Sequence, residues 1–320
     1  MRNWNDKQNE AWPESTTDFP QPGRDSERSA ELLHNEETWI NKQTDAPIGV
    51  FDSGAGGLTI LAALRQELPH ESFIYLGDTA NCPYGVRSDE EITALTLESC
   101  RILIQHGVKL IVIACNTASQ AALSTLRATL SEVPFVGVVP AVKPATRLTR
   151  KGRIGIAATN QAAKAIYLRQ LIDEFAGGMQ AFAVGCPELV TLVERGQFEG
   201  AEVEQIVRQA LQPVLDEDID VLVLGCTHFP ALRKVIEQIA GPKVQVIDSG
   251  QAIARRTRSV LQIQGMLAPT TLLANGGGQL EIWCSGDPEA FSSVATTILG
   301  QPVHAQQVET VTLQARPKLT

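Results

Sequence analysis

The sequence predicts an α/β protein with two pseudo-symmetric parallel-sheet domains and a ligand site in the crevice between them. From Pro47 onward, short apolar runs alternate with helical stretches, which is typical of a parallel sheet covered on both faces. A weak internal repeat divides this part of the chain into two halves. Each half carries a cysteine directly after a buried strand, in "IVIACNTAS" from Ile111 and in "VLVLGCTHFP" from Val221.

The first 46 residues differ from the rest of the chain. They are rich in Asn, Gln, Glu, Ser, Thr and Pro and lack the apolar periodicity of a packed element. We therefore expect residues 1–46 to form a flexible N-terminal extension.

The remaining elements follow from apolar runs of strand length and from helical periodicity. Strands are expected at Ile48–Phe51, Phe73–Leu76, Leu110–Ala114, Phe135–Val138, Ile154–Ala157, Ala181–Val184, Val221–Leu224 and Val244–Ile247. Helices are expected at Gly57–Leu68, Glu90–His106, Ala118–Leu130, Gln161–Phe175, Val203–Leu215, Ala231–Ala240 and Ala252–Ile263. A strand at Leu280–Cys284, a helix at Pro288–Leu299 and a strand at Val308–Leu313 would close the chain.

The repeat sets the expected domains. "GVFDSGAGG" opens one half and "IGIAATNQA" the other, and Cys115 lies 63 positions after Asp52, as Cys226 lies 68 positions after Ala158. We expect a first domain of residues 47–140 plus 249–320 and a second of residues 141–248. Because ligands bind at the carboxyl ends of strands in open α/β sheets, the two thiols should face one crevice.

The charge and the hydropathy of the sequence limit the classes of binding partner and the expected location. Asp plus Glu outnumber Lys plus Arg by 36 to 27, and no basic tract stands out, which disfavours nucleic acid and anionic membranes. No apolar run has the length of a membrane span, and no signal peptide is recognisable, so the expected location is the cytoplasm. The six cysteines are therefore expected to be free thiols, and none has the CxxC spacing of a structural zinc site.

The glycine-rich stretch "DSGAGG" from Asp52 lies between a strand and a helix. It matches neither the dinucleotide fingerprint nor the P-loop. Two interpretations stay open: the backbone amides bind a small anion, or the glycines permit a tight turn. In "DTANCPYG" from Asp78, similarly, Tyr84 and Gly85 offer a hydroxyl and an amide, or Tyr84 only covers the core.

Cysteine at a strand end is most often a small buried hydrophobe, but two at matched positions suggest chemistry. A single nucleophilic thiol with His228 as its base would use Cys226 and leave Cys115 without a role. Two thiols permit a two-base reaction, in which one removes a proton from a chiral carbon and the other returns a proton to the opposite face. For an amino acid, Asn116, Thr117 and Thr227 are candidate donors to the α-carboxylate. Asp52 is a candidate partner for the ammonium group.

Seven motifs together closely resemble glutamate racemases, in the order that the family has them. They are "FDSGAGGLT" from Phe51, "GDTANCPYG" from Gly77, "ACNTAS" from Ala114, "VGVVPAVKPA" from Val136, "CPELVTLVERG" from Cys186, "GCTHFP" from Gly225 and "DSGQAIARR" from Asp248. The resemblance spans residues 47–313.

The resemblance implies cofactor-independent interconversion of L- and D-glutamate, which supplies D-glutamate for peptidoglycan. It implies that Cys115 takes the proton from the D-isomer and Cys226 from the L-isomer, with Asp52 assisting Cys115, and Glu194 and His228 assisting Cys226. The implied substrate-binding residues are Asp52, Ser53, Tyr84, Gly85, Asn116, Thr117, Thr227 and His228. No metal and no cofactor are implied. One departure is Asn81, where family members commonly carry Arg.

The implied partner is L- or D-glutamate, and activation by a peptidoglycan precursor and a homodimer are further options. Three alternatives stay open at this point: an aspartate racemase of the same superfamily, a hydrolase or transferase using Cys226 and His228, and a non-catalytic binding module.

Overall fold

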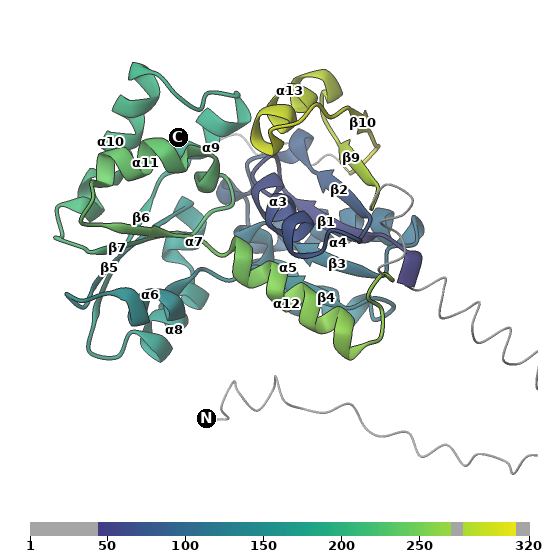
Figure 1. The fold of residues 1–320 in the computed structure, drawn as a ribbon, viewed down its shortest axis with the longest axis horizontal. Helices are drawn as coiled ribbons and strands as arrows, with labels where there is room; N and C mark the ends of the chain where they lie inside the picture. Colours follow the sequence, from purple (N-terminus) through teal and green to yellow (C-terminus); the bar gives the residue numbers. More distant parts are fainter. Residues whose placement is uncertain (1–43, 270–277, 312–320) are drawn as a thin grey trace, which may run out of the picture. The chain divides into compact units, whose positions relative to one another are not determined.

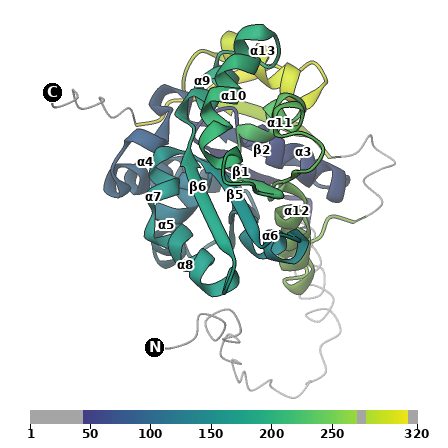
Figure 2. The same cartoon turned by 90° about the vertical axis from the view of Figure 1, so that its left-hand side faces the viewer.

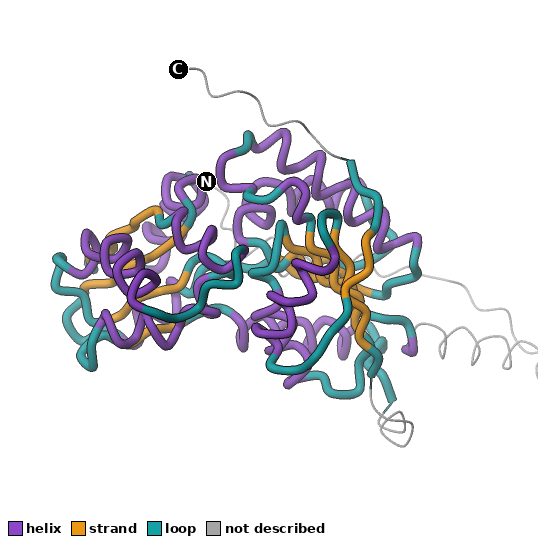
Figure 3. Tube along the Cα trace, turned by 90° about the horizontal axis from the view of Figure 1, so that it is seen from above, coloured by secondary structure: helices purple, strands orange, loops and turns teal. Residues whose placement is uncertain are grey.

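The computed structural model describes residues 44–269 and 278–311. Its strands form two separate parallel sheets, drawn in orange in Figure 3. The first sheet has the order β10-β9-β2-β1-β3-β4, and the second has the order β6-β5-β7-β8. The predicted fold class, two parallel-sheet α/β units, is confirmed.

The first sheet takes its strands from both ends of the described chain. They are β1 (Ile48–Asp52), β2 (Phe73–Gly77), β3 (Leu110–Ile113), β4 (Phe135–Gly137), β9 (Leu280–Cys284) and β10 (Ala305–Gln307). Its helices are α3 (Leu58–Glu67), α4 (Asp89–Gln105), α5 (Asn116–Thr129), α12 (Gly250–Ile263) and α13 (Pro288–Leu299) (Figure 1).

The second sheet uses the middle of the chain. Its strands are β5 (Arg153–Ala158), β6 (Gln180–Gly185), β7 (Val221–Leu224) and β8 (Gln245–Ile247). Its helices are α6 (Val142–Leu148), α7 (Asn160–Lys164), α8 (Ile166–Phe175), α9 (Pro187–Glu194), α10 (Ala201–Leu215) and α11 (Arg233–Ala240). In Figure 2, α9, α10 and α11 lie on one side of β5 and β6, and α6 and α8 lie on the other.

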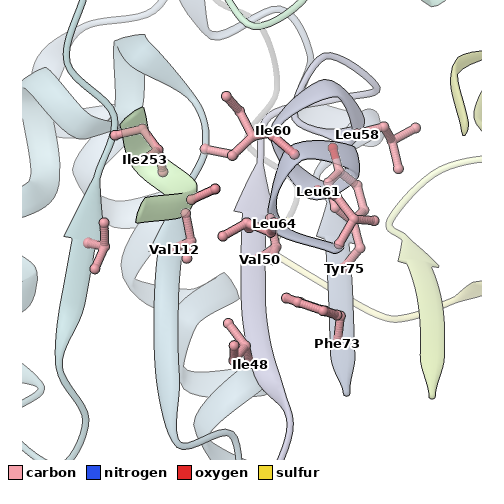
Figure 4. Packing of buried hydrophobic residues seen from close by; sticks show 14 of the residues in the cluster. Ile48, Val50, Leu58, Ile60, Leu61, Leu64, Phe73, Tyr75, Val112 and Ile253 are labelled. Carbon is pink, nitrogen blue, oxygen red and sulfur yellow. The ribbon is translucent and has the colours of Figure 1, made fainter. Parts of the chain in front are cut away.

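Burial on both faces explains why the strands are almost uniformly apolar. On one face of the first sheet, Leu58, Leu61 and Leu64 of α3 pack over Val50 of β1 and Tyr75 of β2 (Figure 4). On the other face, apolar side chains of α4 and α5 form a second cluster with the sheet. Both faces of these strands are therefore covered by helices.

The internal repeat is visible in the strand order, because β2-β1-β3-β4 corresponds to β6-β5-β7-β8. Phe51 is paired with Ile113 in the first sheet, and Ala157 with Leu224 in the second. Each thiol lies two positions after the last paired residue of the central pair, Cys115 after Ile113 and Cys226 after Leu224. The repeat thus delivers both cysteines to carboxyl ends of parallel strands, as predicted.

Two predicted elements are wrong. The helix expected over Gln161–Phe175 is broken at Ala165, which has extended backbone dihedrals. Thr159 begins α7 by accepting a hydrogen bond from the Ala162 amide, and the extended Ala165 separates α7 from α8, a break that the helical pattern does not indicate.

The strand expected over Val308–Leu313 is also wrong for its described residues. The strand is β10, and pairing ends when the Val308 amide donates to the Cys284 carbonyl. Residues 308–311 then leave the sheet, because Thr310 donates to Asp78 and the Val311 carbonyl accepts from Asn81. Residues 312–313 lie outside the described chain.

Two helices were not predicted, α6 and α9, and α9 begins with a proline at its first turn. The extension expected over residues 1–46 lies outside the described residues except for 44–46, and the segment 270–277 is likewise outside them. The domain boundaries near residues 140 and 248 remain predictions. None of the helices within 44–269 and 278–311 is long and apolar enough to cross a membrane.

The packing of α3 generates a stability prediction. Leu61 is fully buried, so Leu61→Ala should lower the free energy of unfolding by about 2–5 kcal/mol, through lost burial and the remaining cavity. Urea denaturation followed by circular dichroism measures this change. Leu148→Ala is the control, since Leu148 is 40% exposed and its truncation should cost less than about 0.5 kcal/mol. Equal losses in the two variants would contradict the packing described for α3.

Candidate functional site

The loop between β1 and α3 brings polar side chains from both halves of the repeat into contact. A side chain at Gly54 would overlap Glu194 Oε1, and one at Gly56 would overlap the His228 ring. At Gly57, a Cβ would lie 2.5 Å from Asp52 Cβ. These glycines are therefore required by the close approach of three polar side chains.

The same loop also binds anions, and the anions are the chain's own carboxylates. The Gly54 amide donates to Asp52 Oδ1 at 2.9 Å, and the Ala55 amide donates to Glu194 Oε1 at 2.7 Å. The close approaches confirm the tight turn, the amides of this loop bind carboxylates of the chain itself, and binding of a separate anion stays a prediction.

Cys226, His228 and Glu194 form a hydrogen-bonded series. Cys226 follows β7, His228 precedes the short helix at Phe229–Leu232, and Glu194 is the last residue of α9. His228 Nδ1 lies 3.6 Å from Cys226 Sγ, and Nε2 lies 2.6 Å from Glu194 Oε1. The imidazole thus connects a thiol to a carboxylate.

The electrostatics of this series favour an ion pair. Burial alone would lower the pKa of His228, but its hydrogen bonds with Cys226, Cys82 and Glu194 raise that pKa well above its ordinary value. Burial opposes ionisation of Glu194, yet the hydrogen bond from His228 holds its pKa below the ordinary value. The arrangement is therefore an imidazolium between a carboxylate and the Cys226 sulfur.

Cys115 has a different environment. Its Sγ caps α5, accepting from the Ala118 amide at 3.4 Å, and lies 3.5 Å from Ser53 Oγ. Burial, reinforced by the nearby charge of Asp52, raises the pKa of this thiol to about 12. In the free protein this sulfur is therefore protonated at neutral pH.

Asp52 lies at the end of β1 and is fully buried. Its Oδ2 accepts a hydrogen bond from Thr227 Oγ1 at 3.0 Å, which joins the first sheet's loop to the residue after Cys226. Burial raises its pKa to about 6, although the charge of His228 and the Gly54 amide act in the opposite direction. A carboxyl group with this pKa changes protonation close to neutral pH, which suits proton transfer.

Both thiols line a single cavity of about 210 Å³. Nine of the predicted site residues line it: Ser53, Tyr84, Gly85, Cys115, Asn116, Thr117, Cys226, Thr227 and His228. Asp52 and Glu194 are not among the lining residues and lie behind them, hydrogen-bonded to Thr227 and His228. The structure thus brings all the predicted residues together: nine line the cavity, and two are hydrogen-bonded to lining residues.

Two lining residues are of particular interest for ligand binding. The Tyr84 hydroxyl donates to the buried carboxylate of Asp78 at 2.6 Å, so this hydroxyl is engaged within the protein. Asn116 Oδ1, in contrast, is buried and has no hydrogen-bond partner among the described residues. An acceptor without a partner beside two thiols is suited to an N–H donor of a ligand.

Sequence reasoning missed part of the lining. The additional residues are Pro83, Val86, Thr159, Asn160, Pro187, Val190 and Thr191. Thr159 Oγ1 lies 3.3 Å from Thr117 Oγ1, across the two sheets. The internal repeat could have identified Thr159 as a site residue, since Thr159 follows the last residue of β5 as Ser53 follows the last residue of β1.

Comparison with known proteins gives one consistent family. The model of the Asp/Glu/Hydantoin racemase family matches residues 58–257. A glutamate racemase of Herpetosiphon aurantiacus is 44% identical over 250 residues, which cover 78% of this chain and 96% of the relative.

Solved structures agree with the sequence match. A glutamate racemase isoform from Bacillus anthracis superposes with a TM-score of 0.76 at 36% identity, covering 83% of this chain and 98% of that one. Escherichia coli glutamate racemase, solved with L-glutamate and the activator UDP-MurNAc-Ala, gives a TM-score of 0.72 at 32% identity, covering 83% and 99%.

The ion pair generates a prediction for Glu194→Gln. The neutral amide removes the charge beside His228 Nε2, so the pKa of His228 should fall, since burial then acts with less opposition. A pH titration of the labelled imidazole by NMR measures this pKa. Glu188→Gln, an exposed substitution in the same helix, is the matched control and should leave it unchanged. A His228 pKa that is equal in both variants and the wild type would contradict the ion pair.

Proposed function

This chain belongs to the Asp/Glu/Hydantoin racemase family, and we propose that it interconverts L- and D-glutamate by transferring protons at the α-carbon with two thiols. Its named relatives across most of the chain are glutamate racemases, so it is an amino-acid racemase, an isomerase, and the aspartate alternative is not favoured. The reaction would supply D-glutamate for peptidoglycan synthesis.

One observation carries the proposal: Cys115 and Cys226 line the same cavity from opposite halves of the repeat. Inversion at a carbon needs one base and one acid on opposite faces. With L-glutamate bound, Cys226 as thiolate removes the α-proton, and Cys115 as thiol donates a proton to the other face. With D-glutamate bound, the two sulfurs exchange these roles.

The electrostatics support this starting state for the L-isomer. The imidazolium of His228 places a positive charge and an N–H donor 3.6 Å from Cys226 Sγ, on the side where the base is needed. The high pKa of Cys115 keeps that thiol protonated and ready to donate. With D-glutamate, Cys115 must first become a thiolate. Asp52, which lies close to Cys115 and has a pKa of about 6, then accepts the proton that Cys115 loses.

The carbanion formed at the α-carbon needs stabilisation by groups that are already in position. We assign this role to donors near the two sulfurs, the side chain of Thr117 and the backbone amide of Gly85, because the Thr227 hydroxyl already donates to Asp52. The partnerless Asn116 Oδ1 and the Ser53 hydroxyl would hold the ammonium group of the substrate. Tyr84 contributes its ring to the wall, with its hydroxyl held by Asp78.

The finer partner expectations remain predictions. An activating peptidoglycan precursor is supported by the Escherichia coli relative solved with UDP-MurNAc-Ala. A homodimer and a cytoplasmic location rest on the sequence resemblance and composition.

The experiment that tests the function is isotope incorporation in D2O. Either glutamate isomer, incubated without added cofactor, should yield the opposite isomer with deuterium at the α-carbon, as measured by NMR. Aspartate, assayed in parallel, should react far more slowly. Binding of glutamate without inversion would contradict the proposal and support a binding module.

Cys115→Ser separates the racemase from a hydrolase that uses Cys226 and His228 alone. Loss of one acid–base group should lower kcat/KM by about 10²–10⁴-fold. The loss should be equal in both directions, because the two isomers have equal free energy. Cys100→Ala is the control, since Cys100 is buried in the core and does not line the cavity. Full activity of Cys115→Ser would contradict the two-thiol proposal.

The raised pKa of Asp52 predicts a pH dependence. If the carboxylate form is needed, kcat/KM should fall as the pH drops below about 6, because Asp52 then becomes protonated. The side chain of glutamate ionises near pH 4.3 and does not interfere. Asp52→Asn should lower kcat/KM at neutral pH by about 10²-fold and abolish this acidic limb. Asp173 is exposed, so Asp173→Asn is the control and should retain the acidic limb. If the acidic limb persists in Asp52→Asn, it arises from the titration of another group.

A further inference from the structure

A second group of reactive side chains lies beside the two thiols of the cavity. Cys82, Glu194 and His228 each place one ligand atom so that all three atoms lie within 4.8 Å of one another. Cys82 comes from the loop after β2, Glu194 from the end of α9, and His228 from the segment after β7. Cys82 does not line the cavity and takes no part in the proposed proton transfers.

The environment of this third thiol is unusual. Burial raises the pKa of Cys82 to about 12, although its hydrogen bond with His228 acts in the opposite direction. The neutral thiol also lies beside the Glu194 carboxylate, whose pKa it helps to lower. The thiol of the half-buried Cys82 is thus held against a carboxylate and an imidazole, with Asp52 nearby as a second carboxyl group.

The convergence depends on Gly54. A Cβ at that position would overlap Glu194 Oε1 and would lie 3.0 Å from Cys82 Sγ. The Ala55 amide, at 2.7 Å, then fixes the carboxylate. Because Gly54 has no Cβ, the three ligand atoms can lie close together beside the backbone of this loop.

The chemistry of the three groups matches that of a thiophilic divalent cation. Thiolate, imidazole and carboxylate are the ligands that bind Zn²⁺, at about 2.0–2.3 Å from the metal. Such bond lengths place ligand atoms roughly 3–4 Å apart, so atoms already within 4.8 Å need only small movements. Three protein ligands also leave a fourth position open, as in zinc sites that are not purely structural.

We propose that Cys82, Glu194 and His228 form a binding site for Zn²⁺, or for Cd²⁺ as its spectroscopic substitute, and that occupancy inhibits the enzyme. On binding, Cys82 loses its thiol proton and His228 the proton that it shares with Glu194, and both protons pass to solvent. The cation then replaces the hydrogen bond between His228 and Glu194. Inhibition rests on the proposed role of His228, whereas cation binding itself does not.

Cadmium titration of the metal-free, full-length chain tests the site directly. We expect one Cd²⁺ per chain, with the ultraviolet charge-transfer absorption of a cadmium–thiolate bond. Cys82→Ser should lose this absorption and bind Cd²⁺ at least about tenfold more weakly, since even loss of an outer-shell partner can cost that much. Circular dichroism checks that the variant is folded, and Cys82→Ala replaces it if it is not.

Single substitutions of the other two thiols are the matched controls. Cys115→Ser and Cys226→Ser should keep the absorption and the stoichiometry, because neither residue belongs to the group of three. Loss of the absorption in Cys226→Ser, with retention in Cys82→Ser, would overturn the site and place the cation on the thiols of the cavity.

Inhibition is measured separately. The Zn²⁺ concentration that halves the rate of glutamate inversion should rise at least about tenfold in Cys82→Ser, in line with the weaker binding. Cadmium bound at Cys82 without any effect on inversion would overturn the inhibitory role. An inactive wild-type chain that still binds Cd²⁺ through Cys82 would instead contradict the proposed racemase function and support the site.

Discussion

The carboxylate of Glu194 is the group on which the arrangement of the site depends. It accepts one hydrogen bond from the Ala55 amide and another from His228, so it joins α9 to the loop after β1 and to the segment after β7. Removing a carboxylate from water costs free energy unless it is hydrogen-bonded or paired with a positive charge. The missing side chains at Gly54 and Gly56 allow the pairing, because they let Glu194 and His228 approach the backbone of the loop.

Once this pairing is made, the two thiols become chemically different although the backbone around them is repeated. Cys226 has an imidazolium beside it, whereas Cys115 has a helix amide, a hydroxyl and a carboxyl group of raised pKa. The difference comes partly from the backbone, since Cys115 precedes helix α5 directly and Cys226 precedes the short helix Phe229–Leu232, and partly from side chains. Asp52 is the last residue of β1, and the residue in the matching position at the end of β5 is Ala158.

The sequence predicted the fold class and the placement of the thiols because both depend on short, regular signals. Apolar runs followed by Cys115 and Cys226 indicate strand ends directly, and the repeat relates them. Glu194 is different: it lies 32 positions before Cys226, and only the family resemblance pointed to it. Its contacts with Ala55 and His228 join segments that are distant in the sequence, so no periodic pattern predicts them.

The errors have the same origin. The helical pattern carries no signal of the break at Ala165, and the displaced last strand follows from contacts of Thr310 and Val311 with the loop after β2. The absence of CxxC spacing argued against a structural zinc site, but spacing says nothing about ligands from three separate segments, such as Cys82, Glu194 and His228.

The unequal surroundings of the thiols bear on how a racemase completes its cycle. In the proposed two-thiol mechanism, each turnover leaves the two sulfurs with their protonation states exchanged, so the free enzyme must return a proton from one side to the other before it can accept the same isomer again. A buried carboxyl group with a pKa of about 6 near Cys115 and an imidazolium–carboxylate pair beside Cys226 give both sides a group that can hold that proton. The repeat supplies the mirror-like placement of the sulfurs. In the proposed mechanism, the departures from it, Asp52 on one side and His228 with Glu194 on the other, would supply the means of resetting their protonation states.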